Sequence, residues 1–415
     1  MIRSDEPIFV ALDIGTSKIV ALVAHLDHEG RVRVIGVGKT DSAGIRKGGV
    51  VSLEALARAI ATVKDKAERT SGYEIDSALV SVSGSHIAST NSSGMAGVSG
   101  RTIALEDVTR ALDAAQSVAI PYNREVVHVI PRGYIVDGQD GIKSAIGMHG
   151  YRLEVEAHIV TASSTALRNL EKCVEAVGIM VDGWVISSLA AAEVVLTDTE
   201  REMGVVAVDI GAGTCDVAVH IEGAVWHTAV IPVGGDHMTN DIAQGLHLPS
   251  ETAEQVKRRH GIARRAMTDE AQAFAVRPFG EDGTVHIKRA DLANILEPRV
   301  EELFSLVRQE IKRSGYDGLL PAGVVLTGGT SQLPGMRELA ADVLKLPVRT
   351  AGPESLRGLV DKLQSPAYST SVGILEWARV QDEQGLLNGH YSRDFSWEDL
   401  NWTQAMDFLK RLLPG

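Results

Sequence analysis

Apolar residues follow two different spacings along the chain, and these spacings predict a mixed α/β protein. Continuous apolar runs are typical of strands buried on both faces, whereas apolar residues three and four positions apart indicate helices. Residues 52–70 show the helical spacing, with Leu53, Leu56, Ile60 and Val63 on one face. The strand-like segments are 9–12, 18–26, 31–38 and 76–82, and the other helix-like segments are 163–177, 336–344 and 371–380.

One strand-and-turn pattern occurs twice. The opening segment Val10-Ala11-Leu12-Asp13-Ile14-Gly15 returns as Val206-Ala207-Val208-Asp209-Ile210-Gly211, and an apolar strand follows each copy. A third glycine turn, at 327–331, also follows a buried strand. A repeated turn in two halves of a chain predicts two similar α/β units that face one ligand.

Residues 84–160 differ from the flanking segments in composition and in hydrophobic pattern, and they interrupt the first unit. They contain a Ser- and Gly-rich stretch at 89–100, a helical pattern at 105–117, and strand-like segments at 125–135 and 151–160. This pattern predicts a small inserted α+β subdomain. Near the end of the chain, residues 381–395 have the composition of a linker, and 397–413 read as a short amphipathic helix.

Composition and charge narrow the function. The net charge is −13 at pH 7, which argues against nucleic acid as a partner. Two cysteines, Cys173 and Cys215, exclude a disulfide scaffold and a cysteine-based zinc site. No signal peptide and no apolar run long enough to span a membrane are recognisable, so we expect a cytoplasmic protein with at most peripheral membrane contact.

The chemistry of the repeated turns suits phosphate. Glycines allow backbone N–H groups to approach oxygen atoms closely, and a Ser or Thr hydroxyl adds a donor. Asp13 and Asp209 are repelled by phosphate and are better suited to hold Mg²⁺ through water. Neither the GxxxxGK[ST] nor the GxGxxG motif occurs, so a P-loop or Rossmann site is not supported.

The three turns resemble the two phosphate motifs and the adenosine motif of the actin, heat-shock chaperone and sugar kinase superfamily. Within it, the chain resembles the FtsA family of bacterial cell-division proteins along almost its whole length. The segments that carry this resemblance are 150–160, 231–236, 296–303 and 368–373. The first belongs to an extra subdomain, called 1C, that is particular to this family. The resemblance implies an actin-like two-lobed ATP-binding fold with duplicated ribonuclease-H-like cores.

The resemblance also implies a site for ATP and Mg²⁺ between the lobes. The phosphates would contact the first glycine turn from one lobe and the second glycine turn from the other. Asp13 and Asp209 would order Mg²⁺ through water. Glu254 and Lys257 would flank the ribose and adenine. The other residues implied are Gly15, Thr16, Ser17, Lys18, Gly211, Gly213, Thr214, Gly234, Gly235, Gly328 and Gly329.

The sequence departs from the active members of the superfamily at one position. These proteins place Glu or Gln on the helix that links the lobes, where the side chain orients the attacking water. Ser187 occupies that position here, and Glu193 lies nearly two turns further on. Because serine positions water poorly, we expect tight ATP binding with weak or absent hydrolysis.

Two further regions are implied to bind partners. The family ends in a membrane-targeting helix, and the residues here that would insert or lie at the surface are Trp402, Met406, Phe408, Leu409, Lys410, Arg411, Leu412 and Leu413. The family captures the C-terminal peptide of the tubulin-like division protein FtsZ on one subdomain. The basic residues in that region are Lys257, Arg258, Arg259, Arg264, Arg265 and Arg299.

The implied function is that of an ATP-bound, self-assembling adaptor that tethers FtsZ filaments to the membrane and recruits later division proteins through the inserted subdomain. The alternatives are a pilus-assembly adaptor and an active ATPase or sugar kinase of the same superfamily. Each of these assignments has a structural alternative. The basic cluster could be a solvated face, and Glu254 and Lys257 could be a surface ion pair. Lys18 could be a solvated strand residue, and the last helix could pack against its own domain. The expected subdomains are 1–83 with 162–196 and 366–380, 84–161, 197–235 with 301–365, and 236–300, followed by the linker 381–395 and the helix 396–415.

Overall fold

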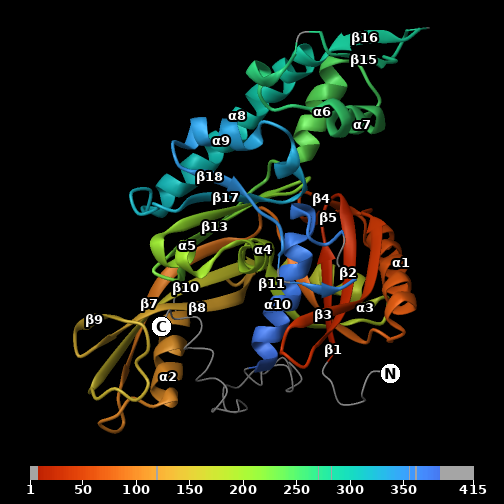
Figure 1. Cartoon of the computed structure of the whole chain (residues 1–415). Helices are drawn as coiled ribbons and strands as arrows, with labels where there is room; N and C mark the ends of the chain where they lie inside the picture. Colours follow the sequence, from red (N-terminus) through yellow and green to blue (C-terminus); the bar gives the residue numbers. More distant parts are fainter. Residues whose placement is uncertain are drawn as a thin grey trace.

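The computed structural model describes residues 8–117, 120–269, 271–281, 283–354, 356–359 and 362–383. Two mixed sheets form the centres of two lobes, and a third sheet lies in the inserted subdomain (Figure 1). The expected helix at 396–415 and the linker from residue 384 onward lie outside the described residues.

The first lobe contains a six-stranded sheet covered on both faces. Its strands, in the order β11-β6-β1-β2-β3-β19, are Met180–Ile186, Ser77–Val82, Ile8–Ile14, Lys18–Leu26, Val32–Asp41 and Arg357–Gly358. Val10, Leu12 and Ile14 face the helices α1 (Leu53–Ser71) and α3 (Ser164–Glu175). Phe9 and Ala11 face α10 (Ser369–Glu383). The continuous apolar run of β1 therefore reflects burial on both faces.

The second lobe repeats this plan. Its strands, in the order β14-β13-β12-β17-β18, are Ala224–Ile231, Cys215–Ile221, Val205–Ile210, Gly323–Thr327 and Val348–Thr350. In each lobe the first strand pairs antiparallel with the next strand along the chain and parallel with a later one. The duplicated cores expected from the repeated turn are therefore present.

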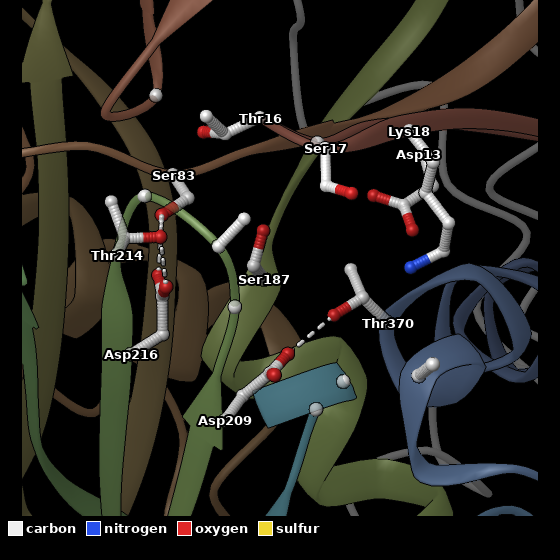
Figure 2. Close-up of a pocket in the computed structure, with 18 of the residues that line it drawn as sticks. Asp13, Thr16, Ser17, Lys18, Ser83, Ser187, Asp209, Thr214, Asp216 and Thr370 are labelled. Carbon is white, nitrogen blue, oxygen red and sulfur yellow. Dashed lines mark hydrogen bonds between the residues drawn. The ribbon is translucent and has the colours of Figure 1, made fainter. Parts of the chain in front are cut away.

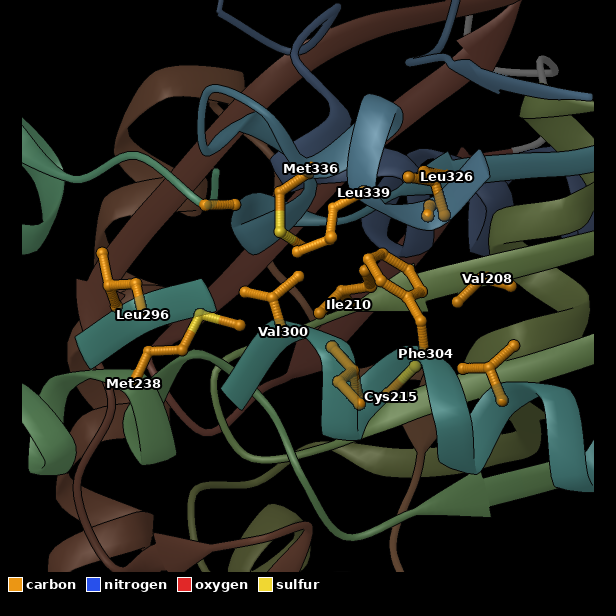
Figure 3. Close-up of a cluster of buried hydrophobic side chains, with 14 of the residues drawn as sticks. Val208, Ile210, Cys215, Met238, Leu296, Val300, Phe304, Leu326, Met336 and Leu339 are labelled. Atoms are coloured by element: carbon orange, nitrogen blue, oxygen red, sulfur yellow. The ribbon is translucent and has the colours of Figure 1, made fainter. Parts of the chain in front are cut away.

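One apolar core joins the second sheet to the helices above it. The long helix α8 (Arg289–Ser314) places Val300 and Phe304 against Ile210 and Cys215 (Figure 3). Helix α9 (Met336–Leu344) lies on the same side. At the far end of α8 lie α6 (Gly235–Gly245), α7 (Ser250–His260) and the hairpin of β15 (Ala273–Val276) and β16 (Val285–Lys288) (Figure 1).

The inserted subdomain is a four-stranded antiparallel sheet with one helix on it. The strand order is β7-β10-β8-β9, with bounds Ala88–Gly97, Arg152–Ser163, Arg124–Val136 and Gln139–Ile142, and α2 (Leu105–Gln116) packs on the sheet. The Ser- and Gly-rich stretch forms strand β7, which the sequence pattern did not predict. β7 lies along β14 of the second lobe, where Ser89 and Asn91 donate to the carbonyls of Thr228 and Trp226 at 2.8 and 3.2 Å.

Helix α4 (Ser187–Val195) follows β11 and contacts strands of both lobes, and α10 packs against it. The remaining elements are the short helix α5 (Asp198–Met203) and the hairpin of β4 (Ile45–Arg46) and β5 (Gly49–Val50). Helix α10 ends at Glu383, so the segment expected to be a linker from residue 381 begins within this helix.

Candidate functional site

The three glycine turns meet in one cleft between the lobes. The inner chamber, of about 90 Å³, contains Asp13 and the following turn from β1–β2, Asp209 and the following turn from β12–β13, and the glycines after β17. Figure 2 shows Thr16, Ser17 and Lys18 along one wall, opposite Asp209, Thr214 and Asp216. The predicted residues that line this chamber are Asp13, Gly15, Thr16, Ser17, Lys18, Asp209, Gly211, Gly213, Thr214, Gly328 and Gly329.

The two repeated turns are built alike. The amide of Gly15 donates to the carbonyl of Lys18 at 3.1 Å, and the amide of Gly211 donates to the carbonyl of Thr214 at 2.9 Å. At two positions in the cleft, an added Cβ would collide with a neighbouring residue. A Cβ on Gly213 would lie 2.5 Å from Thr16 Oγ1 of the other lobe, and a Cβ on Gly328 (φ 86°) would lie 2.2 Å from Asp209 Oδ1.

Gly234 and Gly235 lie directly behind the second turn. The amide of Gly235 donates to the carbonyl of Gly211 at 3.0 Å, and Gly234 precedes the first residue of α6. Neither glycine lines either chamber, so both support the turn rather than form the cleft wall.

The predicted aspartates are held by hydroxyl groups. Asp13 accepts from Ser81 at 3.0 Å and from Ser371 at 2.6 Å, and Asp209 accepts from Thr370 at 2.7 Å. Burial raises the pKa of Asp209 to about 6, with Thr370 and Lys18 opposing the rise and the charge of Asp13 adding to it. Two carboxylates directed into one cleft form a site suited to a cation.

A third carboxylate, Asp216, lines the inner chamber, and sequence reasoning missed it. Ser83 and Thr214 donate to its two oxygens at 2.7 and 2.9 Å. Burial, reinforced by Asp209, raises its pKa to about 7. The available signal was its spacing, because Asp216 follows Thr214 by two residues at the start of β13, and alternate residues of an extended segment point to the same side.

Ser187 lines the inner chamber at the first residue of α4. Its hydroxyl donates to the carbonyl of Val82 at 3.3 Å. Glu193 lies outside the cleft, where it pairs with Arg201 at 3.1 Å. In the part of the chain that the structure describes, the carboxylates of the inner chamber are Asp13, Asp209 and Asp216.

An outer chamber of about 390 Å³ opens from the inner one, a size within the ~300–1,000 Å³ of small-molecule pockets. Glu254 and Lys257 line it and pair with each other at 2.6 Å. Burial alone would raise the pKa of Glu254, but Lys257, Thr239 and Arg258 lower it to about 2. Tyr368 lies opposite, with the ammonium groups of Lys18 and Lys39 5.2 and 5.5 Å from its ring centre.

The predicted basic cluster does not form one free patch. Lys257 turns into the outer chamber, Arg264 pairs with Asp342 at 2.6 Å, and Arg299 pairs with Asp241 at 2.6 Å. Arg258 pairs with Glu254 at 2.7 Å, and the guanidinium of Arg265 donates to Asn294 at 2.9 Å. Arg259 is exposed on α7.

The described residues have two further properties that bear on metal ions and membranes. Among these residues, no three His, Cys, Asp or Glu side chains are grouped so as to hold a metal ion. None of the helices within the described ranges has the length and apolar character needed to cross a bilayer. The segment predicted to target the membrane lies outside these ranges.

Comparisons with known proteins agree over nearly the whole chain. Family models described as "Cell division protein FtsA" and "SHS2 domain inserted in FTSA" match residues 206–373 and 84–161. The chain is 42% identical to cell division protein FtsA of Pseudomonas aeruginosa, over 98% of this chain and 97% of that protein. It is 38% identical to the Escherichia coli K12 protein of the same name, over 93% of each.

Solved structures share the fold at low identity. The chain superposes on a chain of the PilM-PilN type IV pilus biogenesis complex with a TM-score of 0.65 at 16% identity, covering 89% of this chain and 98% of that one. It superposes on MreB5 of Spiroplasma citri bound to ADP with a TM-score of 0.58 at 14% identity, covering 92% and 99%. These likenesses show an actin-like two-lobed architecture.

Proposed function

Because the chain belongs to the FtsA family of cell-division proteins, we propose that it binds ATP with Mg²⁺ and self-assembles to tether FtsZ filaments to the membrane. The observation that carries the nucleotide proposal is the pair of matching turns facing each other across the cleft. Each turn ends a buried strand, carries one aspartate and exposes backbone between glycines. The structures of MreB5 of Spiroplasma citri bound to ADP and to AMPPNP share the fold and support the proposal that this chain binds a nucleotide.

Within the described ranges no three His, Cys, Asp or Glu side chains are grouped as direct metal ligands, so the inner chamber fits a Mg²⁺ that is held through its own waters. Asp13, Asp209 and Asp216 offer hard oxygen donors, and the pKa values of Asp209 and Asp216 are raised by burial and further by neighbouring carboxylates, both of which a cation would offset. Among the described residues, Lys18 is the cation that lines this chamber, which also contains three carboxylates. Mg²⁺ would bridge phosphate oxygens and offset their charge, while Asp13 and Asp209 orient its waters.

The outer chamber fits the nucleoside. Lys257 is held by Glu254, by Thr239 and by the carbonyl of Gly235, so its ammonium group is fixed at the chamber wall. Gly329 and Leu333 supply a wall of backbone and apolar surface against which a flat base would lie.

We expect ATP to bind with a Kd that rises when Mg²⁺ is chelated. Titration of the purified protein with ATP, with and without EDTA, tests this, and no heat of binding in either buffer would contradict it.

The proposed adaptor role adds FtsZ as the partner. We propose that an acidic segment of the FtsZ C-terminal peptide meets the subdomain formed by 236–300, where Arg259 is exposed. A pull-down with that peptide, and with a scrambled peptide of equal charge as control, tests the proposal. Equal capture of both peptides would overturn it.

The pilus-assembly alternative lacks comparable support. The likeness to the PilM-PilN complex is one of fold, at 16% identity, whereas the cell-division proteins match at 36–42% over most of the chain. A double helical filament of MamK shares the fold with a TM-score of 0.51, which is consistent with self-assembly.

We propose that the inserted subdomain, whose Met95 and Tyr151 are exposed, contacts later division proteins.

We propose that the protein works at the cytoplasmic face of the cell membrane, at the division site, through residues 396–415. Trp402, Phe408 and Leu409 supply the apolar groups, and residues Lys410 and Arg411 the positive charge. The full chain should sediment with vesicles of mixed anionic and neutral lipid, and a chain lacking 396–415 should not. A variant with Trp402 and Phe408 both changed to Ser is the matched control for the deletion. Equal sedimentation of the full and shortened chains would refute this localisation.

A further inference from the structure

Three consecutive hydroxyl residues form the first turn of α10, and each bonds to a different strand end. Ser369 shares a hydrogen bond of 2.6 Å with Thr327 on β17. Thr370 donates to Asp209 on β12 at 2.7 Å, and Ser371 donates to Asp13 on β1 at 2.6 Å. All three side chains are buried. A single turn of helix therefore touches two of the three aspartates of the cleft, Asp13 from the first lobe and Asp209 from the second.

The turn is fixed in place by the first lobe. Val372, Ile374 and Leu375 lie in the core of that lobe, beneath β1 and β2. Gly373 allows α10 to approach α4 so closely that an added Cβ would lie 1.8 Å from the carbonyl oxygen of Ala190. Because neither helix can move aside, the positions of the hydroxyl groups are set by packing.

The hydroxyl groups in turn set the orientation of the two carboxylates. Asp13 is held on both oxygens, by Ser81 and by Ser371. Asp209 accepts from Thr370 on one oxygen, and its other oxygen lies where a Cβ on Gly328 would fall. Each carboxylate oxygen has a second lone pair, so it can still accept from water on a hydrated ion. Figure 2 shows the bond from Thr370 to Asp209, with Asp13 and Lys18 nearby.

We infer that the first turn of α10 positions Asp13 and Asp209 for one shared, hydrated Mg²⁺, and thereby sets how much Mg²⁺ strengthens nucleotide binding. Thr370 and Ser371 are positioning residues in this arrangement. The inference rests on the proposed binding of ATP with Mg²⁺. It assigns a role to residues that lie far from the phosphate turns in the sequence.

The test compares ATP binding with and without Mg²⁺ in four variants of the full chain. In Thr370→Val and Ser371→Ala, we expect the ratio of the Kd in EDTA to the Kd in Mg²⁺ to fall by roughly tenfold, or about 1.4 kcal/mol. Ser369→Ala removes a buried hydroxyl from the same turn without touching an aspartate, so it should keep the wild-type ratio. Thr370→Ser restores the donor and should also keep the ratio.

The ratio separates positioning from stability. A merely structural role would weaken ATP binding equally with and without Mg²⁺, and that result would overturn the inference. The inference would also be overturned if Ser369→Ala lowered the ratio of the two Kd values as much as Ser371→Ala does. Thr370→Val conserves side-chain shape, so it provides a folded test even if Ser371→Ala unfolds, and urea unfolding monitors all four variants. If the wild type binds no ATP in either buffer, the proposed function itself fails.

Discussion

Asp209 and Asp216 lie directly opposite each other on the antiparallel strands β12 and β13. Opposed like charges destabilise a strand pair, yet both side chains line the inner chamber. Burial and the charge of Asp209 together raise the pKa of Asp216 to about 7. The fold thus keeps an unfavourable arrangement at the place where the proposed cation would bind, which is characteristic of functional sites.

Replacing Asp216 by Asn should stabilise the protein without nucleotide. The amide removes one of two opposed charges and can still accept from Ser83. We expect the free energy of unfolding in EDTA at pH 8 to rise by about 1 kcal/mol, since one unit of pKa shift corresponds to about 1.36 kcal/mol. Asp216→Ala is the control, and it should destabilise because it leaves Ser83 and Thr214 without their acceptor. Urea unfolding measures both, and a less stable Asp216→Asn would contradict the expectation.

The contact between the two phosphate turns predicts the effect of a single added carbon. In Gly213→Ala, the Cβ meets Thr16 Oγ1 at 2.5 Å and Lys47 Cα at 3.0 Å, so Thr16 or one of the two turns must shift. We expect the Kd for ATP to rise at least tenfold, or about 1.4 kcal/mol. Gly97→Ala, where nothing lies within 4 Å of the added carbon, should bind ATP like the wild type. Calorimetric titration of both variants tests this, and unchanged binding by Gly213→Ala would show that the turns do not act as a clamp.

The sequence predicted the features that local patterns encode. The repeated Asp-Ile-Gly turn predicted the paired cores, and the change in composition and hydrophobic pattern at residue 84 predicted the inserted subdomain. Strand β7 escaped prediction because its Ser and Gly residues have low strand propensity. Its pairing with β10 and its hydrogen bonds to β14 stabilise it instead. Thr370 and Ser371 were missed because packing of α10, rather than any local motif, brings them to the aspartates.

The position of Ser187 predicts slow hydrolysis. Its short side chain is bonded to the carbonyl of Val82, so it is not available to orient water well. We expect phosphate release well below several turnovers per minute, and Ser187→Ala should leave this rate unchanged. Ser187→Gln should raise it, because an amide reaches further into the inner chamber. Release at several turnovers per minute by the wild type would show that another group, such as Asp216, takes this role.

Arg299 and Arg259 should have separable effects. Arg299 makes a two-pronged bond with Asp241 at 2.6 and 3.0 Å, which joins α8 to α6. Arg299→Met should therefore lower the free energy of unfolding by about 1 kcal/mol. Arg259→Met should leave stability unchanged while weakening capture of the FtsZ peptide. Urea unfolding and peptide pull-down of both variants distinguish these outcomes, and equal loss of stability in the two would contradict the assignment.

The docking of the inserted subdomain on the second lobe should weaken in acid. His158 on β10 is buried and bonds to Asn91 at 2.7 Å and to Thr228 of β14 at 3.0 Å. Burial, assisted by His227, Arg132 and His128, lowers its pKa to about 3. The unfolded chain, with a histidine pKa of about 6.5, then binds more protons than the folded chain between these values, so stability falls as the pH drops below about 6.5.

His158→Gln tests this dependence, because the amide bonds to the same partners but does not titrate. We expect the wild type to lose stability between pH 7 and pH 5 by about 1–2 kcal/mol more than the variant does. His28→Gln, at an exposed position in the turn after β2, is the control and should follow the wild-type curve. Hydrogen exchange of the β7 and β14 amides should report the same change locally. If the curves of the wild type and His158→Gln run parallel, the neutral histidine is not what holds the two sheets together.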